Sequence, residues 1–220
     1  SPANDEVSID VQFAGVGLID ALWTTGRMPS RLGRIPGLEV SGTIRELGEN
    51  VTTVTVGQKV AAILPSTGGF AEVVCAPASL VAEVPDDLTM DLASVVPINT
   101  VTAHLALTTA IRFVPGESLL IHAGAGGLGS QFAQVSRALG AGRIDAVVGT
   151  DAKREIALGF GYEHSYLRDD LSAIPGDTYD IVIDPVGGEA TADAFRVLRS
   201  GGRLVRVGNA SQAADVAVNS

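Results

Sequence analysis

Three glycines stand at a spacing that suits the binding of a diphosphate. Gly124, Gly126 and Gly129 satisfy the pattern G-x-G-x-x-G. Residues without a Cβ allow a sharp turn, and they let a diphosphate approach bare backbone N–H groups at a helix N-terminus, where the helix dipole favours an anion. The pattern alone is weak evidence, because a structural glycine-rich turn has the same composition.

The segments on either side of these glycines are those that a dinucleotide site needs. Residues 118–123 form a short apolar run that predicts a strand, and from Ser130 onward apolar residues recur at helical spacing. Gly140 stands where that helix would stop. A strand, a glycine turn and a helix distinguish a dinucleotide site from a plain turn, so we expect dinucleotide binding. The predicted cradle comprises Gly124, Ala125, Gly126, Gly127, Leu128 and Gly129.

Composition limits the function further. The 220 residues are 46% hydrophobic and 18% charged, with a net charge of −10 and no cluster of Lys or Arg, which argues against nucleic-acid and anionic-membrane partners. A lone cysteine, Cys75, excludes an internal disulfide and a cysteine-rich metal site, and it fits a reducing compartment. Because no apolar run reaches about 18 residues, no membrane span is expected and the cytoplasm is the expected location.

The first part of the chain alternates apolar and polar residues, which predicts half-buried strands. Gly, Pro and Asn separate these runs, as in an all-β module that forms a partly closed barrel. We expect such a module to about residue 85 and assign residues 1–96 to this domain. The predicted strands cover residues 7–14, 40–47, 58–64 and 70–75.

After residues 84–87 the apolar period changes from two to 3.6, and strands then alternate with helices. This alternation predicts an α/β domain over residues 97–220, with a doubly wound parallel sheet covered on both faces. Because no helix or strand closes residues 209–220, we expect a fragment or a chain with a shortened end. The predicted helices are 91–96, 100–112, 130–139, 152–158 and 188–199, and the further strands are 144–148, 163–167, 180–183 and 204–207. The last of these helices is expected to stop at Gly201-Gly202.

Short motifs along nearly the whole chain add a family resemblance. They are Gly15-Val16-x-x-x-Asp20, Gly37-Leu38-Glu39-x-x-Gly42, Val56-Gly57-Gln58-Lys59-Val60, Gly69-Phe70-Ala71-Glu72 and Pro115-Gly116-Glu117. Together with the glycine turn, they resemble the medium-chain dehydrogenase/reductase superfamily, in its zinc-independent quinone oxidoreductase and enoyl reductase branch. The resemblance implies a GroES-like β-barrel module followed by a Rossmann domain.

Zinc-dependent relatives use a Cys and the His of a Gly-His-Glu motif. Here the early segment has no Cys, and Leu38 replaces that His. A catalytic zinc site needs at least three protein ligands, whereas His104, His122 and His164 lie on separate predicted elements. We interpret His122 as a packed or hydrogen-bonded core residue and expect no metal.

The second predicted strand of the α/β domain ends in residues that bear on the choice of cofactor. NAD-specific sites place an acid there for the ribose 2′-OH, and Asp151 is either that acid or the N-cap of the next helix. The resemblance to NADPH-using members instead implies that Thr150 and Lys153 meet the 2′-phosphate, with help from Tyr166. A cation and a hydroxyl complement a dianionic phosphate, so we favour NADPH; otherwise Lys153 is a solvated helix charge.

Further residues are implied at the nicotinamide end of the cofactor. Asp184 lies in a turn that resembles the family's Asp-x-Val-Gly-Gly, and Gly208 and Asn209 resemble its Gly-Asn-Ser-Ser. Asn99 and Thr102 would face the nicotinamide ribose. Each has a simpler interpretation, since Asn99 suits an N-cap, Asn209 a turn, and Asp184 a turn before proline.

The resemblance implies hydride transfer from NADPH to a quinone or another activated α,β-unsaturated carbonyl. Family members supply an Asn and often a Tyr near the developing negative charge, but those positions hold Gly17, Leu22 and Met28 here. Trp23, nearby, is more often pocket wall than proton donor. The catalytic residues therefore stay unassigned, and we expect no strong general acid, which suits quinones better than enoyl thioesters.

Two alternatives remain open. An enoyl reductase of the polyketide or fatty-acid type would act on an enoyl thioester beside neighbouring synthase modules, and Leu120-Ile121-His122-Ala123 resembles such modules. A protein that binds NADPH without catalysis is the alternative from another class. The family resemblance also implies a homodimer as one arrangement.

Overall fold

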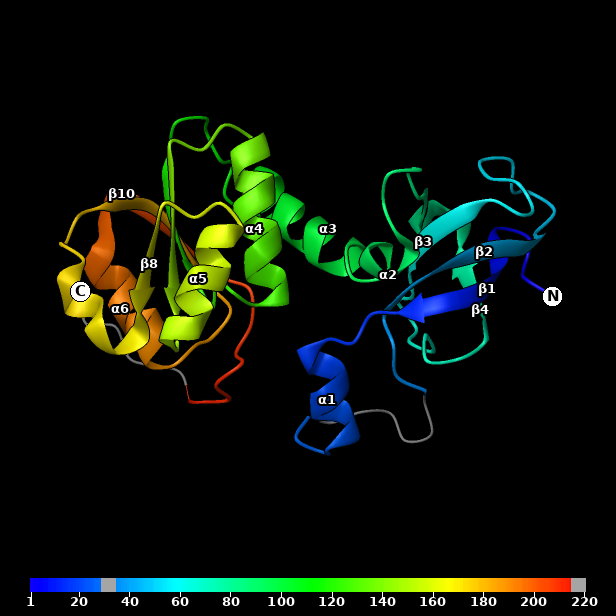
Figure 1. Cartoon of the computed structure of the whole chain (residues 1–220), viewed down its shortest axis with the longest axis horizontal. Helices are drawn as coiled ribbons and strands as arrows, with labels where there is room; N and C mark the ends of the chain where they lie inside the picture. Colours follow the sequence, from blue (N-terminus) through cyan, green and yellow to red (C-terminus); the bar gives the residue numbers. More distant parts are fainter. Residues whose placement is uncertain (29–34, 215–220) are drawn as a thin grey trace. The chain divides into compact units, whose positions relative to one another are not determined.

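A computed structural model describes residues 1–28 and 35–214. The chain divides into two compact units, Ser1–Asn99 and Thr100–Ser220, and Figure 1 labels many of their helices and strands. The boundary after residue 96 stays a prediction of where the two functional domains meet.

The first unit is built on a five-stranded antiparallel sheet in the order β4-β1-β2-β3-β5. Alternate side chains along these strands point to one face, as the period-two pattern predicts, and they form an apolar core that includes Val7, Ile9, Val40, Ile44 and Val60. The strands are β1 (Glu6–Ala14), β2 (Glu39–Leu47), β3 (Lys59–Ile63), β4 (Val73–Pro77) and β5 (Val81–Glu83). The short β5 was not expected from the sequence.

Short helices complete this unit. α1 (Leu18–Thr24) follows β1 (Figure 1) and was not predicted, because seven residues carry too little periodicity. It begins after Gly17, whose N–H donates to the Asp20 carboxylate at 2.9 Å. The 3₁₀ turn η1 spans Ala78–Leu80, and α2 (Met90–Ala93) is a shorter form of the helix expected over residues 91–96.

The second unit contains an all-parallel sheet in the order β10-β9-β6-β7-β8. Its strands are β6 (Ser118–His122), β7 (Arg143–Val148), β8 (His164–Leu167), β9 (Tyr179–Asp184) and β10 (Leu198–Arg206). The chain starts at the central β6, runs outward through β7 to β8, and then returns to β9 on the other side of β6. The carboxyl ends of β6 and β9 therefore form the switch point at which open sheets of this kind bind their ligands.

Helices cover both faces of this sheet, as the doubly wound prediction requires. One face packs Phe132 and Ala133 of α4 (Gly127–Ala138) and Ala157 of α5 (Asp151–Gly159) against strands β6, β7 and β9. The other face packs Ala194 and Val197 of α6 (Glu189–Val197), with the 3₁₀ segment η3 (Arg168–Ala173) nearby in the same core. α3 (Pro97–Leu105) leads into a π-helical turn, η2 (Ala106–Ala110). The predicted α/β fold class is confirmed.

The predicted end of the last helix is wrong. That helix was expected to run to residue 199 and to stop at Gly201-Gly202, but it ends at Val197, and β10 begins at once. The pairing of β10 with β9 is irregular between Leu198 and Arg203, and Gly201 has a φ of +77°. The glycines thus accommodate an irregularity inside a strand, which has the same sequence signal as a helix stop.

Candidate functional site

The glycine turn after β6 is packed very closely against neighbouring backbone and side-chain atoms. A Cβ on Gly124 would lie 2.5 Å from the Cβ of Ala146, and a Cβ on Gly129 would lie 2.5 Å from the carbonyl oxygen of Ala123. Ala123 itself adopts a φ of +54°, a conformation that non-glycine residues rarely take. The first and third glycines of the motif are therefore required by the shape of the turn.

The middle of the same turn presents bare backbone. Gly126 and Gly127 are exposed, and a Cβ on Gly126 would meet a single backbone carbonyl, at 3.1 Å. The hydrogen-bond ladder of α4 begins where the Ser130 N–H donates to the Gly126 oxygen, so the N–H groups of Gly127, Leu128 and Gly129 precede the ladder. N–H groups without a partner in the helix ladder, at the start of a 12-residue helix, fit the diphosphate of a dinucleotide.

The turn after β7 places two of the predicted phosphate contacts together. Thr150 is the N-cap of α5, and its hydroxyl accepts the N–H of Lys153 at 3.4 Å. Asp151 is the first residue of the helix, and its carboxylate pairs with Arg154 at 3.4 Å. The N-cap interpretation of Asp151 is therefore wrong, because the hydroxyl of Thr150 occupies that role.

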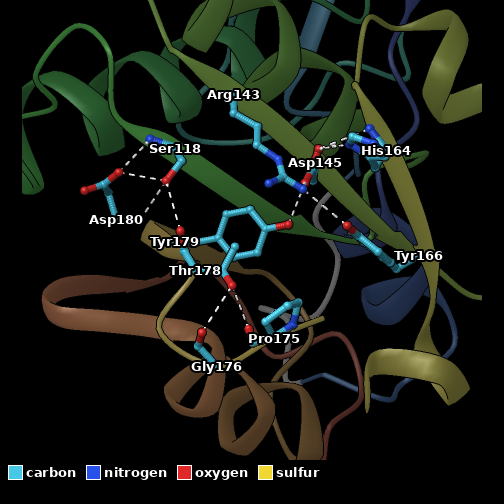
Figure 2. A network of polar contacts seen from close by, with 10 residues as sticks. All are labelled: Ser118, Arg143, Asp145, His164, Tyr166, Pro175, Gly176, Thr178, Tyr179 and Asp180. Carbon is cyan, nitrogen blue, oxygen red and sulfur yellow. Dashed lines mark hydrogen bonds and ion pairs between the residues drawn. The ribbon is translucent and has the colours of Figure 1, made fainter. Parts of the chain in front are cut away.

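Tyr166 points elsewhere in this structure. Its hydroxyl accepts a hydrogen bond from Arg143 Nη2 at 3.3 Å, and Arg143 is also paired with Asp145 at 2.6 Å (Figure 2). Arg143 is the first residue of β7, at the opposite end of that strand from Thr150. A contact between Tyr166 and a 2′-phosphate stays a prediction, and it would require the hydroxyl to leave Arg143.

Asp184 holds the turn after β9. Its side chain is fully buried, and Oδ1 accepts the N–H groups of Val186 at 2.8 Å and Gly187 at 2.9 Å. Oδ2 accepts the hydroxyl of Thr191 at 2.5 Å. Because both oxygens are engaged within the chain, the geometry supports a positioning role for Asp184 in shaping this turn.

The segment after β10 lies against the same turn. A Cβ on Gly208 would lie 3.1 Å from the Pro185 oxygen, which also accepts the Ala210 N–H at 3.0 Å. Asn209 is exposed, and its amide donates to the Ala213 oxygen at 3.0 Å. The structure thus brings Gly208 and Asn209 to the carboxyl end of β9, the strand beside the glycine turn.

Two predicted residues lie in α3. Asn99 is the third residue of that helix, which excludes the N-cap interpretation, and both Asn99 and Thr102 are half-buried. They stand on either side of the division between the two units. Their contact with a nicotinamide ribose stays a prediction.

His122 ends β6 directly before the glycine turn. The ring is 2% exposed, and its Nε2 has no hydrogen-bond partner among the described residues. Burial lowers the pKa of His122, which favours the neutral ring. Within residues 1–28 and 35–214, no group of three or more His, Cys, Asp or Glu side chains is arranged to hold a metal ion.

In the first unit, two buried carboxylates organise the backbone near the motif residues. Asp20 Oδ1 accepts the Gly37 N–H at 2.9 Å, and Glu39 Oε2 accepts the Ile98 N–H at 2.8 Å. Burial raises the pKa of Glu39, with the nearby charge of Asp20 adding to the rise and the Ile98 hydrogen bond opposing it. The motifs contain both acids, but no pattern among the residues indicates this role.

The raised pKa of Glu39 predicts how the stability of the first unit depends on pH. In the folded state Glu39 keeps its proton to a higher pH than in the unfolded state, where its pKa lies near 4.5. The stability of the unit therefore falls as pH rises from the unfolded pKa through the folded pKa. In Glu39→Gln this loss is absent, while the amide oxygen still accepts the Ile98 N–H. We expect the stability of the variant relative to the wild type to be greater at about pH 7 than at about pH 5, measured by denaturant unfolding. An equal difference at both pH values would contradict the assignment.

The positions at which the family resemblance implies polar catalytic side chains supply none here. Gly17 is the N-cap of α1, Leu22 is buried in that helix, and Met28 is exposed. The Met28 N–H donates to the Leu22 oxygen at 3.1 Å, so the three positions lie on one short segment. None of them offers a hydroxyl or an amide side chain to a substrate oxygen.

An open parallel sheet whose strand order reverses beside a bare glycine turn defines the Rossmann-type dinucleotide-binding proteins. Two family models match the chain: an alcohol dehydrogenase GroES-like domain at residues 3–86 and a zinc-binding dehydrogenase domain at residues 127–220. The chain belongs to the medium-chain dehydrogenase/reductase superfamily, in the branch of quinone oxidoreductases and enoyl reductases, which confirms the resemblance seen in the motifs.

Similar proteins fall into two groups. The chain is 30% identical to a mycobacterial quinone oxidoreductase structure, covering 100% of this chain and 70% of that one with a TM-score of 0.84. The structure of Escherichia coli quinone oxidoreductase complexed with NADPH gives 26% identity, coverage of 99% and 69%, and a TM-score of 0.87. Polyketide synthase GfsB of Streptomyces halstedii is 35% identical over 92% of this chain, which spans only 4% of the length of that synthase.

Among the described residues, none of the helices combines the length and the apolar character needed to cross a membrane.

Proposed function

We propose that the protein is an NADPH-dependent, zinc-independent oxidoreductase that reduces a quinone or another activated α,β-unsaturated carbonyl. The observation that carries this proposal is the bare-backbone turn at the N-terminus of α4, which lies at the switch point of the parallel sheet. The likeness to a quinone oxidoreductase complexed with NADPH supports the choice of cofactor.

Each part of the site has a task in this proposal. The N–H groups of Gly127, Leu128 and Gly129 bind the pyrophosphate, and the side chains of Thr150 and Lys153 bind the 2′-phosphate. Asp184 shapes the turn after β9, which positions the backbone beside the nicotinamide end. When bound, NADPH supplies the hydride, and the chain orients it and keeps its phosphates neutralised.

The chemistry at the substrate oxygen follows from the residues that are absent. Reduction of a quinone produces a phenolate, which is a weak base that solvent can protonate. An enoyl thioester produces a more basic enolate, which benefits from a positioned donor. Since Gly17, Leu22 and Met28 offer no donor, the chain suits quinones better. Zinc independence rests on Leu38, which stands where relatives place a histidine ligand.

The test is the oxidation of NADPH, followed by its absorbance, with a series of quinones and with enoyl thioesters. We expect faster turnover of the quinones, faster turnover with NADPH than with NADH, and no loss of activity after treatment with a chelator. Faster turnover of a thioester would favour the enoyl reductase alternative. Binding of NADPH without turnover of any acceptor would favour the non-catalytic alternative.

The likeness to a polyketide synthase gives the enoyl reductase alternative its specific support. In that setting the partners would be neighbouring synthase modules and the substrate a tethered thioester. In the quinone setting the partner is a small molecule in the cytoplasm, and a homodimer stays a prediction.

A further inference from the structure

Arg168 lies over the turn that carries the predicted phosphate contacts. It is exposed and opens η3 directly after β8. A Cβ built on Gly149 would lie 2.7 Å from Arg168 Nη2. Gly149 directly precedes Thr150, so the guanidinium reaches across from the next strand to the backbone that begins α5.

The charges around this turn leave two cations without an acidic partner. Asp151 is paired with Arg154, whose Nε also donates to the Ser165 oxygen at 3.0 Å. Within the described part of the chain, Lys153 and Arg168 form no ion pair, although Asp169 follows Arg168 directly. Two cations without an ion pair, both carried by residues close to one N-cap hydroxyl, complement a dianion.

The charge of Arg168 also reaches the carboxyl end of the central strand. Burial is the main cause of the lowered pKa of His122, and the positive charge of Arg168 also contributes to it. His122 ends β6 next to the glycine turn. Because Gly149 follows the carboxyl end of β7, the guanidinium lies at the edge of the sheet where the dinucleotide is proposed to bind.

Arg168 can replace Tyr166 as the second donor to the phosphate. The hydroxyl of Tyr166 is held by Arg143 at 3.3 Å, within a network centred on Asp145 (Figure 2). Arg168 stands two residues further along the chain and is directed toward Gly149 instead. The second donor beside Lys153 is then a guanidinium, which offers two parallel N–H groups to a phosphate.

We propose that Arg168 is a specificity-determining residue that binds the 2′-phosphate of NADPH together with Lys153. This inference rests on the proposed use of NADPH and adds a residue to it. Arg168 sets the preference for NADPH over NADH and takes no part in the hydride transfer.

The experiment titrates NADPH and NADH separately by fluorescence into the wild type, Arg168→Gln, Arg168→Lys and Lys153→Gln. We expect Arg168→Gln to weaken NADPH binding by about 10-fold or more, which corresponds to loss of one charge-assisted hydrogen bond, and to leave NADH binding unchanged. Lys153→Gln should behave in the same way, and Arg168→Lys should recover part of the preference. Arg137→Gln is the matched control, because it removes one positive charge from a guanidinium that donates to Gly161 instead.

The outcomes separate this inference from the proposed function. The wild type could prefer NADPH while Arg168→Gln binds NADPH as tightly as the wild type, or while the substitution weakens NADPH and NADH binding equally. Either result overturns the role of Arg168 and leaves the cofactor proposal in place. A wild type without preference for NADPH overturns both. Thermal unfolding of each variant verifies that the exposed substitution leaves the fold intact.

Discussion

Replacing Gly129 with alanine is expected to abolish tight NADPH binding and to destabilise the second unit. The added Cβ would lie 2.5 Å from the Ala123 oxygen and 2.7 Å from the Gly124 Cα, and both are backbone atoms that cannot move aside cheaply. Overpacking of this kind costs about 1–3 kcal/mol of unfolding free energy. The displaced N–H groups should weaken NADPH binding by about 100-fold, since several anion contacts change together.

Gly159→Ala is the matched control for this substitution. Gly159 is the last residue of α5, and a Cβ there would meet no atom within 4 Å. Alanine should stabilise the helix by about 0.5–1 kcal/mol and leave NADPH binding unchanged. Fluorescence titration and denaturant unfolding measure both effects. Wild-type affinity in Gly129→Ala would show that the turn is not the pyrophosphate site.

The parts of the fold that could be predicted are those that depend on local pattern. Alternation along β1 and β2 and the apolar runs of β6, β7 and β9 predicted strands in the correct places. The G-x-G-x-x-G spacing likewise predicted the turn, because only glycine tolerates such close packing, although α4 begins at Gly127, three residues before the predicted start. The prediction that Gly201-Gly202 stops a helix was wrong, because a glycine pair is equally typical of a helix end and of an irregular strand.

The parts that could not be predicted depend on tertiary placement. The approach of Arg168 to Gly149 joins η3 to the end of β7 across the sheet, and no spacing in the sequence encodes it. The direction of the Tyr166 side chain depends on the pairing of β8 with β7. Asp145 interrupts an apolar strand, and a lone acid there gives no sign that its partners come from three strands.

Asp145 is the centre of that buried network. Its side chain has no exposed surface, and it accepts hydrogen bonds from Arg143 at 2.6 Å, from the Tyr179 hydroxyl at 2.5 Å and from the His164 backbone N–H at 3.1 Å (Figure 2). Burial raises the pKa of Tyr179, and the hydrogen bond and charge of Asp145 raise it further, so Tyr179 remains a donor. The carboxylate thus joins β7 to β8 and β9.

Asp145→Ala is therefore expected to lower the unfolding free energy by about 3–5 kcal/mol, because it leaves the buried Tyr179 hydroxyl without an acceptor and removes the anion that is paired with Arg143. Tyr179→Phe removes one donor and leaves Asp145 its other partners, so its effect should be smaller. The double variant should be less destabilised than the sum of the single changes, since the two groups interact directly. Additive changes in denaturant unfolding would contradict that coupling.

Arg143 and Tyr179 begin their strands, whereas the glycine turn follows the end of β6. Folded Asp145→Ala should for that reason keep the wild-type affinity for NADPH, which separates what holds the sheet together from what binds the cofactor.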